Sequence, residues 1–275
     1  MRPTNLDEAL AALERPDAML VGGATATALL LKNRLIEPGC LVWLGPLAEL
    51  SGIGELPDGS LEIGATTTLR EISRSPLLRE RTPAFAAAAG EVGNPRVRAV
   101  ATLGGALVHG DPRQDVPPVL LAHRARLEAL SRRGTREIAL ADFFLGFMEC
   151  ALEEDEILTK VTIPPRARWR DAYHRFTPGS EDDYPTVAVA VSLLLESGVV
   201  RDAEIALGGV DASAVRAPEA AAALIGSDGG AAVASEAARL AVASCNPSDD
   251  QRGSAAYKAA MVEVWTQRTI ASCLA

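Results

Sequence analysis

The stretch VRAVATLGGALVHGDPRQDVPPVLLAHRA, residues 97–125, combines a hydroxyl residue, paired glycines, an acidic turn and the apolar start of a helix. Thr102 comes shortly before Gly104 and Gly105, and glycines let a backbone approach a ligand closely. Free N–H groups beside a hydroxyl suit a phosphate. We therefore expect an irregular glycine-containing loop that binds an anion, followed by a polar turn and a helix.

Two polar residues of this stretch each have two possible roles. Asp115 could accept hydrogen bonds from a ribose or an adenine amine, or it could cap the helix that begins at Val116. His109 could act as a base, but a lone histidine in a glycine loop is more often a hydrogen-bonded structural residue.

A second glycine loop lies much earlier in the chain. Residues 18–32, AMLVGGATATALLLK, are typical of a short strand, a turn at Gly22 and Gly23, and a helix. The free N–H groups and the dipole at the start of that helix suit a phosphate. The alternative is an ordinary tight turn, since the stretch is neither a GxGxxG fingerprint nor a Walker loop.

The two loops together say more than either alone, because they could grip the central pyrophosphate of a dinucleotide from both sides. The sequence contains no HExxH, no GxSxG and no paired-histidine site, and no catalytic triad can be assembled from it. We predict a protein that binds a cofactor and has no catalytic residue and no metal ligand of its own.

Composition narrows the class of protein. The formal net charge of −9 argues against a nucleic-acid binder, and no apolar run is long enough to span a membrane. The N-terminus has no apolar segment of the kind found in signal peptides. The four cysteines are far apart and follow no metal-binding spacing, so we expect free thiols and a cytoplasmic protein.

The remaining pattern mixes strands and helices without a clean βαβ repeat. Residues 40–44 and 61–64 are typical of strands, residues 4–15 and 83–93 of helices, and residues 125–140 of a hairpin. Beyond Pro164-Pro165, the best domain boundary, three strand candidates precede three helical stretches. That order predicts an α+β domain.

These loops, in this order, resemble those of the FAD-binding medium subunit of the xanthine dehydrogenase and carbon monoxide dehydrogenase family. The resemblance covers essentially the whole chain. Its matching segments are VGGAT at 21–25, LEIGATTT at 61–68, the 97–125 stretch, DFF at 142–144, DEILTKVTIP at 155–164 and RGSAAYK at 252–258.

The resemblance implies an α+β fold in two domains. Residues 1–166 would form a PCMH-type FAD-binding fold of two α+β subdomains, about 1–55 and 56–166. Residues 170–275 would form a flavoprotein C-terminal domain with a three- to four-stranded antiparallel sheet and a helical bundle.

The resemblance also implies a set of cofactor-binding residues. The two loops would bind the pyrophosphate of FAD mainly through backbone N–H groups, and other positions would contact the adenosine part or border the cofactor. Tyr184 would lie over the isoalloxazine ring, the alternative being a tyrosine in a surface turn. The full set is Val21, Gly22, Gly23, Ala24, Thr25, Thr102, Gly104, Gly105, Val108, His109, Asp115, Leu158, Arg175 and Tyr184.

Two positions depart from the family pattern. Ala99 and Ala106 stand where the family usually has asparagine. Each missing side-chain hydrogen bond would be worth about 0.5–1.5 kcal/mol, so FAD would bind more weakly or through backbone and water contacts.

The function implied is that of an oxidoreductase subunit that relays electrons. A molybdopterin-binding large subunit would act on the substrate, and a small subunit would carry two [2Fe–2S] clusters. The complex would be a heterohexamer, a dimer of heterotrimers. The alternatives are a stand-alone flavin oxidoreductase and an assembly or binding protein that has lost FAD. The substrate and the electron acceptor are not encoded in this chain.

Overall fold

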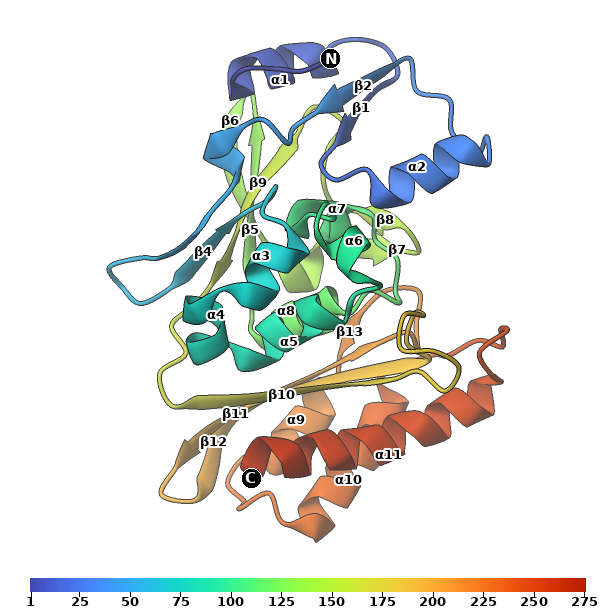
Figure 1. The fold of residues 1–275 in the computed structure, drawn as a ribbon. Coiled ribbons are helices and arrows are strands. Elements are labelled where there is room, and N and C mark those ends of the chain that lie inside the picture. The colour runs from blue at the N-terminus through green and yellow to red at the C-terminus, as the bar shows by residue number, and fades with distance from the viewer.

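The computed structural model describes residues 1–275 and begins with a small α/β unit (Figure 1). Helix α1 (Leu6–Leu13) precedes two parallel strands, β1 (Ala18–Val21) and β2 (Cys40–Trp43), which are joined through α2 (Thr25–Lys32). The side chain of Asn5 caps α1, as a residue of its type does best. A short 3₁₀ turn, η1 (Ala48–Leu50), leads to the next unit.

A five-stranded antiparallel sheet forms the centre of the molecule, in the order β3-β4-β9-β5-β6. Its strands are β3 (Ile53–Glu55), β4 (Leu61–Gly64), β5 (Arg126–Ser131), β6 (Gly134–Ala139) and β9 (Ile157–Ile163). The turn η2 (Leu140–Asp142) and a two-stranded hairpin, β7 (Phe144–Gly146) and β8 (Glu149–Cys150), follow β6.

Six short helices cover this sheet. They are α3 (Leu69–Arg74), α4 (Pro76–Arg81), α5 (Pro83–Glu91), α6 (Pro95–Arg98), α7 (Leu103–Val108) and α8 (Val116–Ala122). Thr68 and Glu71 form a reciprocal capping box that starts α3, and proline at the first position starts α4, α5 and α6. The apolar faces of these helices bury a core of 33 residues with the sheet.

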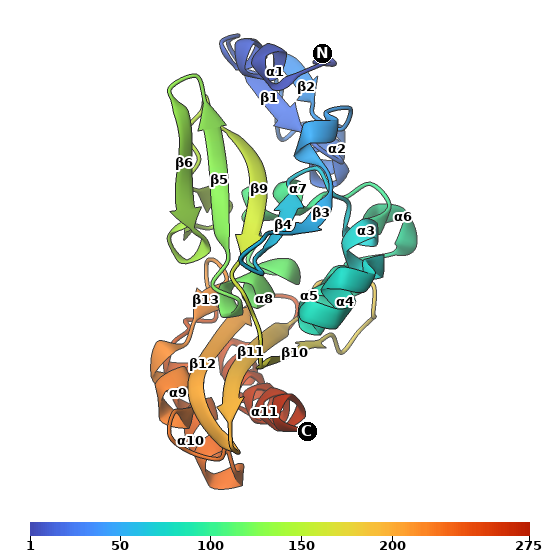
Figure 2. The same cartoon turned by 90° about the vertical axis from the view of Figure 1, so that its left-hand side faces the viewer.

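The C-terminal part is a four-stranded antiparallel sheet, β10-β11-β12-β13, with three helices on one face (Figure 2). The strands are β10 (Trp169–Phe176), β11 (Val187–Glu196), β12 (Val199–Gly208) and β13 (Val215–Arg216). The helices are α9 (Pro218–Leu224), α10 (Ala231–Ala243) and α11 (Ala255–Leu274).

Strand β11 is buried on both faces, and its sequence VAVAV shows how. Val187, Val189 and Val191 point into the core shared with α9, α10 and α11, whereas Ala188 and Ala190 belong to the central core. Side chains alternate across a strand, so the larger residues fill the space under the helices and the small ones admit close packing on the other side. Gly208 continues that close contact, because a Cβ there would lie 2.8 Å from Cγ of Pro118 in α8.

The α+β class is as predicted, and the C-terminal antiparallel sheet, predicted with three to four strands, has four. Strand β3 pairs with β4 and so belongs to the central sheet. Strand β10 begins at Trp169, shortly after Pro164-Pro165. The expected irregular loop after Thr102 contains helix α7, because the Thr102 side chain caps it. No helix combines the length and hydrophobicity needed to cross a membrane.

Candidate functional site

The first glycine loop lies directly against the second. A Cβ built on Gly23 would be 1.7 Å from the carbonyl oxygen of Val100, and one on Gly22 would be 2.5 Å from Oγ1 of Thr102. No side chain fits at either position, so these two glycines are explained by contact between the loops. Both glycines lie between β1 and α2, where the sequence predicts a turn, and the nearest neighbour of each is protein.

The backbone after these glycines presents an array of free donors. Ala24 has the left-handed φ of 53°, which turns the chain into α2 without any side-chain cap. The N–H groups from Gly22 through Thr27 donate no hydrogen bond within the chain. Unpaired N–H groups at a helix N-terminus, together with the helix dipole, form a site for an anion. Strained backbone of this kind is concentrated at binding sites.

The second loop contributes differently. The N–H of Gly104 donates to the carbonyl oxygen of Ala65 at 2.7 Å, and that of Gly105 donates to Oγ1 of Thr102 at 3.2 Å. A Cβ on Gly104 would lie 2.9 Å from Cβ of Ala65, so this glycine allows close packing within the protein. The free groups of the loop are the N–H and the hydroxyl hydrogen of Thr102, and that hydroxyl faces Gly22.

Asp115 is held in a contact between the two parts of the molecule. Its side chain does not cap α8. Instead Oδ1 accepts a 2.6 Å hydrogen bond from the hydroxyl of Tyr173 and lies 3.3 Å from Nε of Arg175, both on β10. Arg175 in turn donates to the carbonyl oxygens of Glu91 and Asp183. The structure therefore gives Asp115 and Arg175 a role in joining the domains.

The electrostatics of Asp115 follow from its surroundings. Burial raises the pKa of its carboxyl to about 6, although the Arg175 guanidinium and the Tyr173 hydroxyl oppose that rise. The pKa of Tyr173 is raised in turn by burial and by the neighbouring carboxylate. The pKa of Asp115 therefore reflects burial, which raises it, and two partners from the C-terminal domain, which limit that rise.

Tyr184 lies in the loop between β10 and β11 and is 43% exposed. Arg252 fixes this loop: its guanidinium lies 5.8 Å from the centre of the Tyr184 ring and donates to Oδ1 of Asp183 at 2.6 Å. Burial raises the pKa of the Tyr184 hydroxyl, with smaller contributions from Asp111 and Asp115. These charges show that Tyr184 is close to the turn that follows α7.

The other predicted positions are more scattered. Val108 is exposed at the end of α7, and His109 is half-buried with no side-chain hydrogen bond. Val21 is buried at the end of β1, and Thr25 opens α2. Leu158 is buried in the central core on β9 and shows almost no surface.

Sequence reasoning missed a second group of residues that fix the turn after α7. Arg113 donates to Oδ2 of Asp250 at 3.0 Å, and the buried Lys258 reaches the same oxygen at 2.9 Å. Ser254 caps α11 between them. The RGSAAYK stretch was the signal, because it places Arg252, Ser254 and Lys258 where they can hold the two loops beside Tyr184.

Comparisons with known proteins give matches over both parts of the chain. Residues 1–166 match the family described as the FAD binding domain in molybdopterin dehydrogenase, and residues 172–273 match the CO dehydrogenase flavoprotein C-terminal domain. The chain is 31% identical to the carbon monoxide dehydrogenase medium chain of Hydrogenophaga pseudoflava, over 98% of this chain and 94% of the relative. It is 33% identical to the nicotine 6-hydroxylase medium subunit of Paenarthrobacter nicotinovorans, over 98% and 94%.

Solved structures show the same relationship. The structure of carbon monoxide dehydrogenase from Hydrogenophaga pseudoflava superimposes with a TM-score of 0.95 at 33% identity, covering 99% of this chain and 95% of that one. Quinoline 2-oxidoreductase from Pseudomonas putida 86 gives a TM-score of 0.93 at 30% identity, with 99% and 95% covered.

Proposed function

From the premise that this chain belongs to the family of FAD-binding medium subunits of molybdenum hydroxylases, we propose that it relays electrons from an iron–sulfur partner to an external acceptor. The chain is an FAD-binding subunit of an oxidoreductase. FAD supplies the redox chemistry when it is bound, and the protein holds, orients and shields it.

The first glycine loop carries the proposal. Its N–H groups from Gly22 through Thr27 have no partner in the chain, and the hydroxyl of Thr102 faces them. A pyrophosphate is the part of FAD that such an array recognises, because its oxygens accept several hydrogen bonds at once. We place the pyrophosphate on this loop, with Gly104 and Gly105 holding the shape of the opposite loop.

The remaining predicted residues divide into two groups in this proposal. Val108, His109 and Tyr184 lie on or near the turn after α7, and we assign them to the adenosine and isoalloxazine parts of the cofactor. Asp115 and Arg175 would act through the domain contact that places that turn. Leu158 would support the cofactor from within the core.

No residue of the chain needs to move a proton for this role. The buried Asp115 and Tyr173 are occupied with each other, and no group of His, Cys, Asp or Glu side chains is arranged to hold a metal ion. Chemistry on an organic substrate would belong to a molybdopterin-binding large subunit. We extend the proposal to a heterohexameric complex in the cytoplasm, with domains close to residues 1–166 and 170–275.

Absorption spectroscopy tests the proposal directly. The purified chain should show flavin bands, and these should bleach when a reduced iron–sulfur subunit from the native complex is added. Gly23→Val is the matched negative control, because it closes the loop that we assign to the pyrophosphate. A chain that binds no FAD on reconstitution would favour the assembly-protein alternative. A chain that oxidises NADH, alcohols or amines by itself would favour the stand-alone oxidoreductase.

A further inference from the structure

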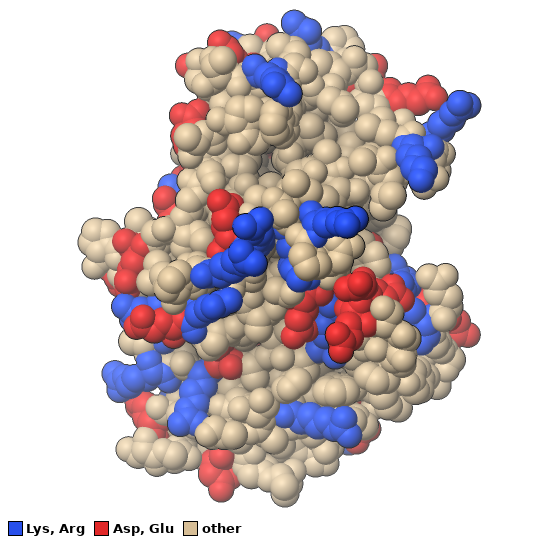
Figure 3. Space-filling view, in the orientation of Figure 1, with Lys and Arg blue, Asp and Glu red and all other residues tan.

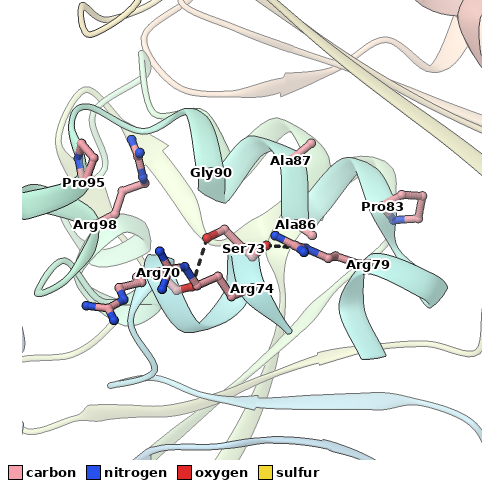
Figure 4. Close-up of a pocket in the computed structure, with 10 residues that line it drawn as sticks. All are labelled: Arg70, Ser73, Arg74, Arg79, Pro83, Ala86, Ala87, Gly90, Pro95 and Arg98. Atoms are coloured by element: carbon pink, nitrogen blue, oxygen red, sulfur yellow. Dashed lines mark hydrogen bonds between the residues drawn. The ribbon is translucent and has the colours of Figure 1, made fainter. Parts of the chain in front are cut away.

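A cavity of about 420 Å³ lies between α3 and α5, away from the first glycine loop, and arginines surround it (Figure 4). Arg70, Arg74 and Arg79 come from α3 and α4, and Arg98 comes from the end of α6. The floor is made of small residues of α5. We call this feature the arginine groove and define it by these four arginines with Ala87 and Gly90.

None of the four guanidinium groups forms an ion pair with a carboxylate, whereas the neighbouring Arg81 pairs with Glu55 at 2.9 Å. Two of them are nevertheless fixed. Arg79 donates from Nε to the carbonyl oxygen of Ser73 at 2.8 Å, and Arg98 donates from Nη1 to those of Val92 and Gly93. A fixed guanidinium with free donors is prepared for bidentate contact with a carboxylate or phosphate.

The charge around the groove is unusual for this chain. The protein has a net charge of −9, yet basic side chains gather at this place on the face shown in Figure 3. Acidic residues lie beside it, where Glu91 at the end of α5 is close enough to Glu181 for their charges to interact. Adjacent patches of opposite sign give a docking surface both attraction and a defined orientation.

The start of α3, which contributes two of the groove arginines, is hydrogen-bonded to the second glycine loop. The N–H of Leu69, the first residue of α3, donates to the carbonyl oxygen of Ala101 at 2.9 Å, and Thr68 bridges to Thr102. Arg98 ends α6 just before this loop. A ligand or partner bound in the groove would therefore lie near the second glycine loop, which in turn contacts the first.

We propose that the arginine groove docks a carboxylate-rich face of the iron–sulfur partner and so brings that partner to the flavin site. The inference rests on the proposed function. A protein surface fits better than a small anion, because Arg70, Arg74 and Arg79 are exposed at the rim of the groove and would leave a small ligand largely in water. The small side chains of α5 let a partner backbone approach closely, and the net charge disfavours a nucleic acid.

The test compares two double variants of the FAD-loaded chain for association with the iron–sulfur subunit isolated from the native complex. Arg70→Glu with Arg74→Glu reverses the charge of two of the four arginines that define the groove. Lys32→Glu with Arg34→Glu makes the same change of net charge at the far end of α2, on residues that also lack ion pairs. Affinity is measured at roughly 50 and 150 mM sodium chloride, which brackets the range where screening changes.

The groove variant should lose affinity about tenfold or more at low salt and show a flatter salt dependence, with the control variant unchanged. All proteins should keep their flavin absorbance, so a loss of FAD binding would be recognised separately as a failure of the proposed function. Unchanged affinity and salt dependence in the groove variant would overturn the inference. So would a defect confined to association with the molybdopterin-binding subunit. Binding of inorganic pyrophosphate that the groove variant loses while association stays intact would also overturn it, in favour of a small anion.

Discussion

The two glycine loops have similar sequence patterns, but their backbone N–H groups play different roles in the structure. The first loop, Gly22 to Thr27, keeps its N–H groups free at the start of α2. The second loop uses the N–H groups of Gly104 and Gly105 inside the protein. The first loop therefore offers free hydrogen-bond donors, and the second loop packs against the first and fixes its shape. A glycine pair shows that the backbone passes something closely, but not whether that neighbour is a ligand or protein.

The largest effect should come from closing the contact between the loops. Gly23→Val puts a side chain where a Cβ alone would be 1.7 Å from the Val100 carbonyl oxygen. The loops must separate, so we expect complete loss of bound FAD and a destabilisation of about 3 kcal/mol or more. Flavin absorbance and urea unfolding measure both. Gly54→Val is the control, because nothing lies within 4 Å of a Cβ there. Full flavin retention by Gly23→Val would refute the loop contact.

Asp115→Ala should lower the stability of the protein more clearly than it lowers the affinity for FAD. The change leaves the Tyr173 hydroxyl buried without its acceptor and removes the carboxylate that lies 3.3 Å from the buried Arg175 guanidinium, at a cost of about 2–4 kcal/mol in the free energy of unfolding. FAD affinity should fall less than in Gly23→Val, because the first loop remains intact. Denaturant unfolding and flavin titration give the two values. If the variant loses FAD but keeps wild-type stability, the result would instead support a direct contact between Asp115 and the cofactor.

Asp115→Asn should change how stability depends on pH. The folded pKa of about 6 lies above the ordinary value of 3.8, so the folded state binds this proton more tightly than the unfolded state does. The resulting stabilisation is complete below about pH 4 and is lost as the pH rises through 6, by roughly 3 kcal/mol in total. The variant should lack this loss in unfolding measured from pH 4.5 to 7.5. The exposed Asp142→Asn should keep the wild-type profile, and a parallel profile for Asp115→Asn would contradict the assignment.

The smallest expected effect is a change in FAD affinity on substitution of Ala99, which lies just before the second glycine loop. Ala99 is half-buried directly after α6, at a position where the resemblance implies asparagine. Ala99→Asn should restore one side-chain hydrogen bond to the cofactor and tighten FAD binding by about 0.5–1.5 kcal/mol, a few-fold to tenfold. Fluorescence titration measures the affinity, with Ala99→Leu as a control for added size. Equal affinities for wild type and Ala99→Asn would mean that position 99 does not face FAD.

The sequence predicted the fold where local rules decide it. The helical patterns over residues 4–15 and 83–93 match α1 and α5, and the hairpin pattern over residues 125–140 matches β5 and β6. It missed α7, although the cap of that helix is local, because Thr102 accepts a hydrogen bond from the N–H of Gly105. It also could not find contacts that a tertiary partner decides, since Asp115 contacts Tyr173 and Arg175 and does not cap the helix beside it. Those partners lie more than fifty residues away, and no local pattern predicts such a distant contact.

The two-sided burial of β11 has a consequence for how the molecule comes apart. Valines on one face belong to the C-terminal core and alanines on the other belong to the central core, so a single strand is a member of both. Neither part can melt without exposing a face of that strand to water. Although two families describe the chain, its unfolding should follow one cooperative transition, and a protease that cuts near Pro165 should leave two fragments that remain associated.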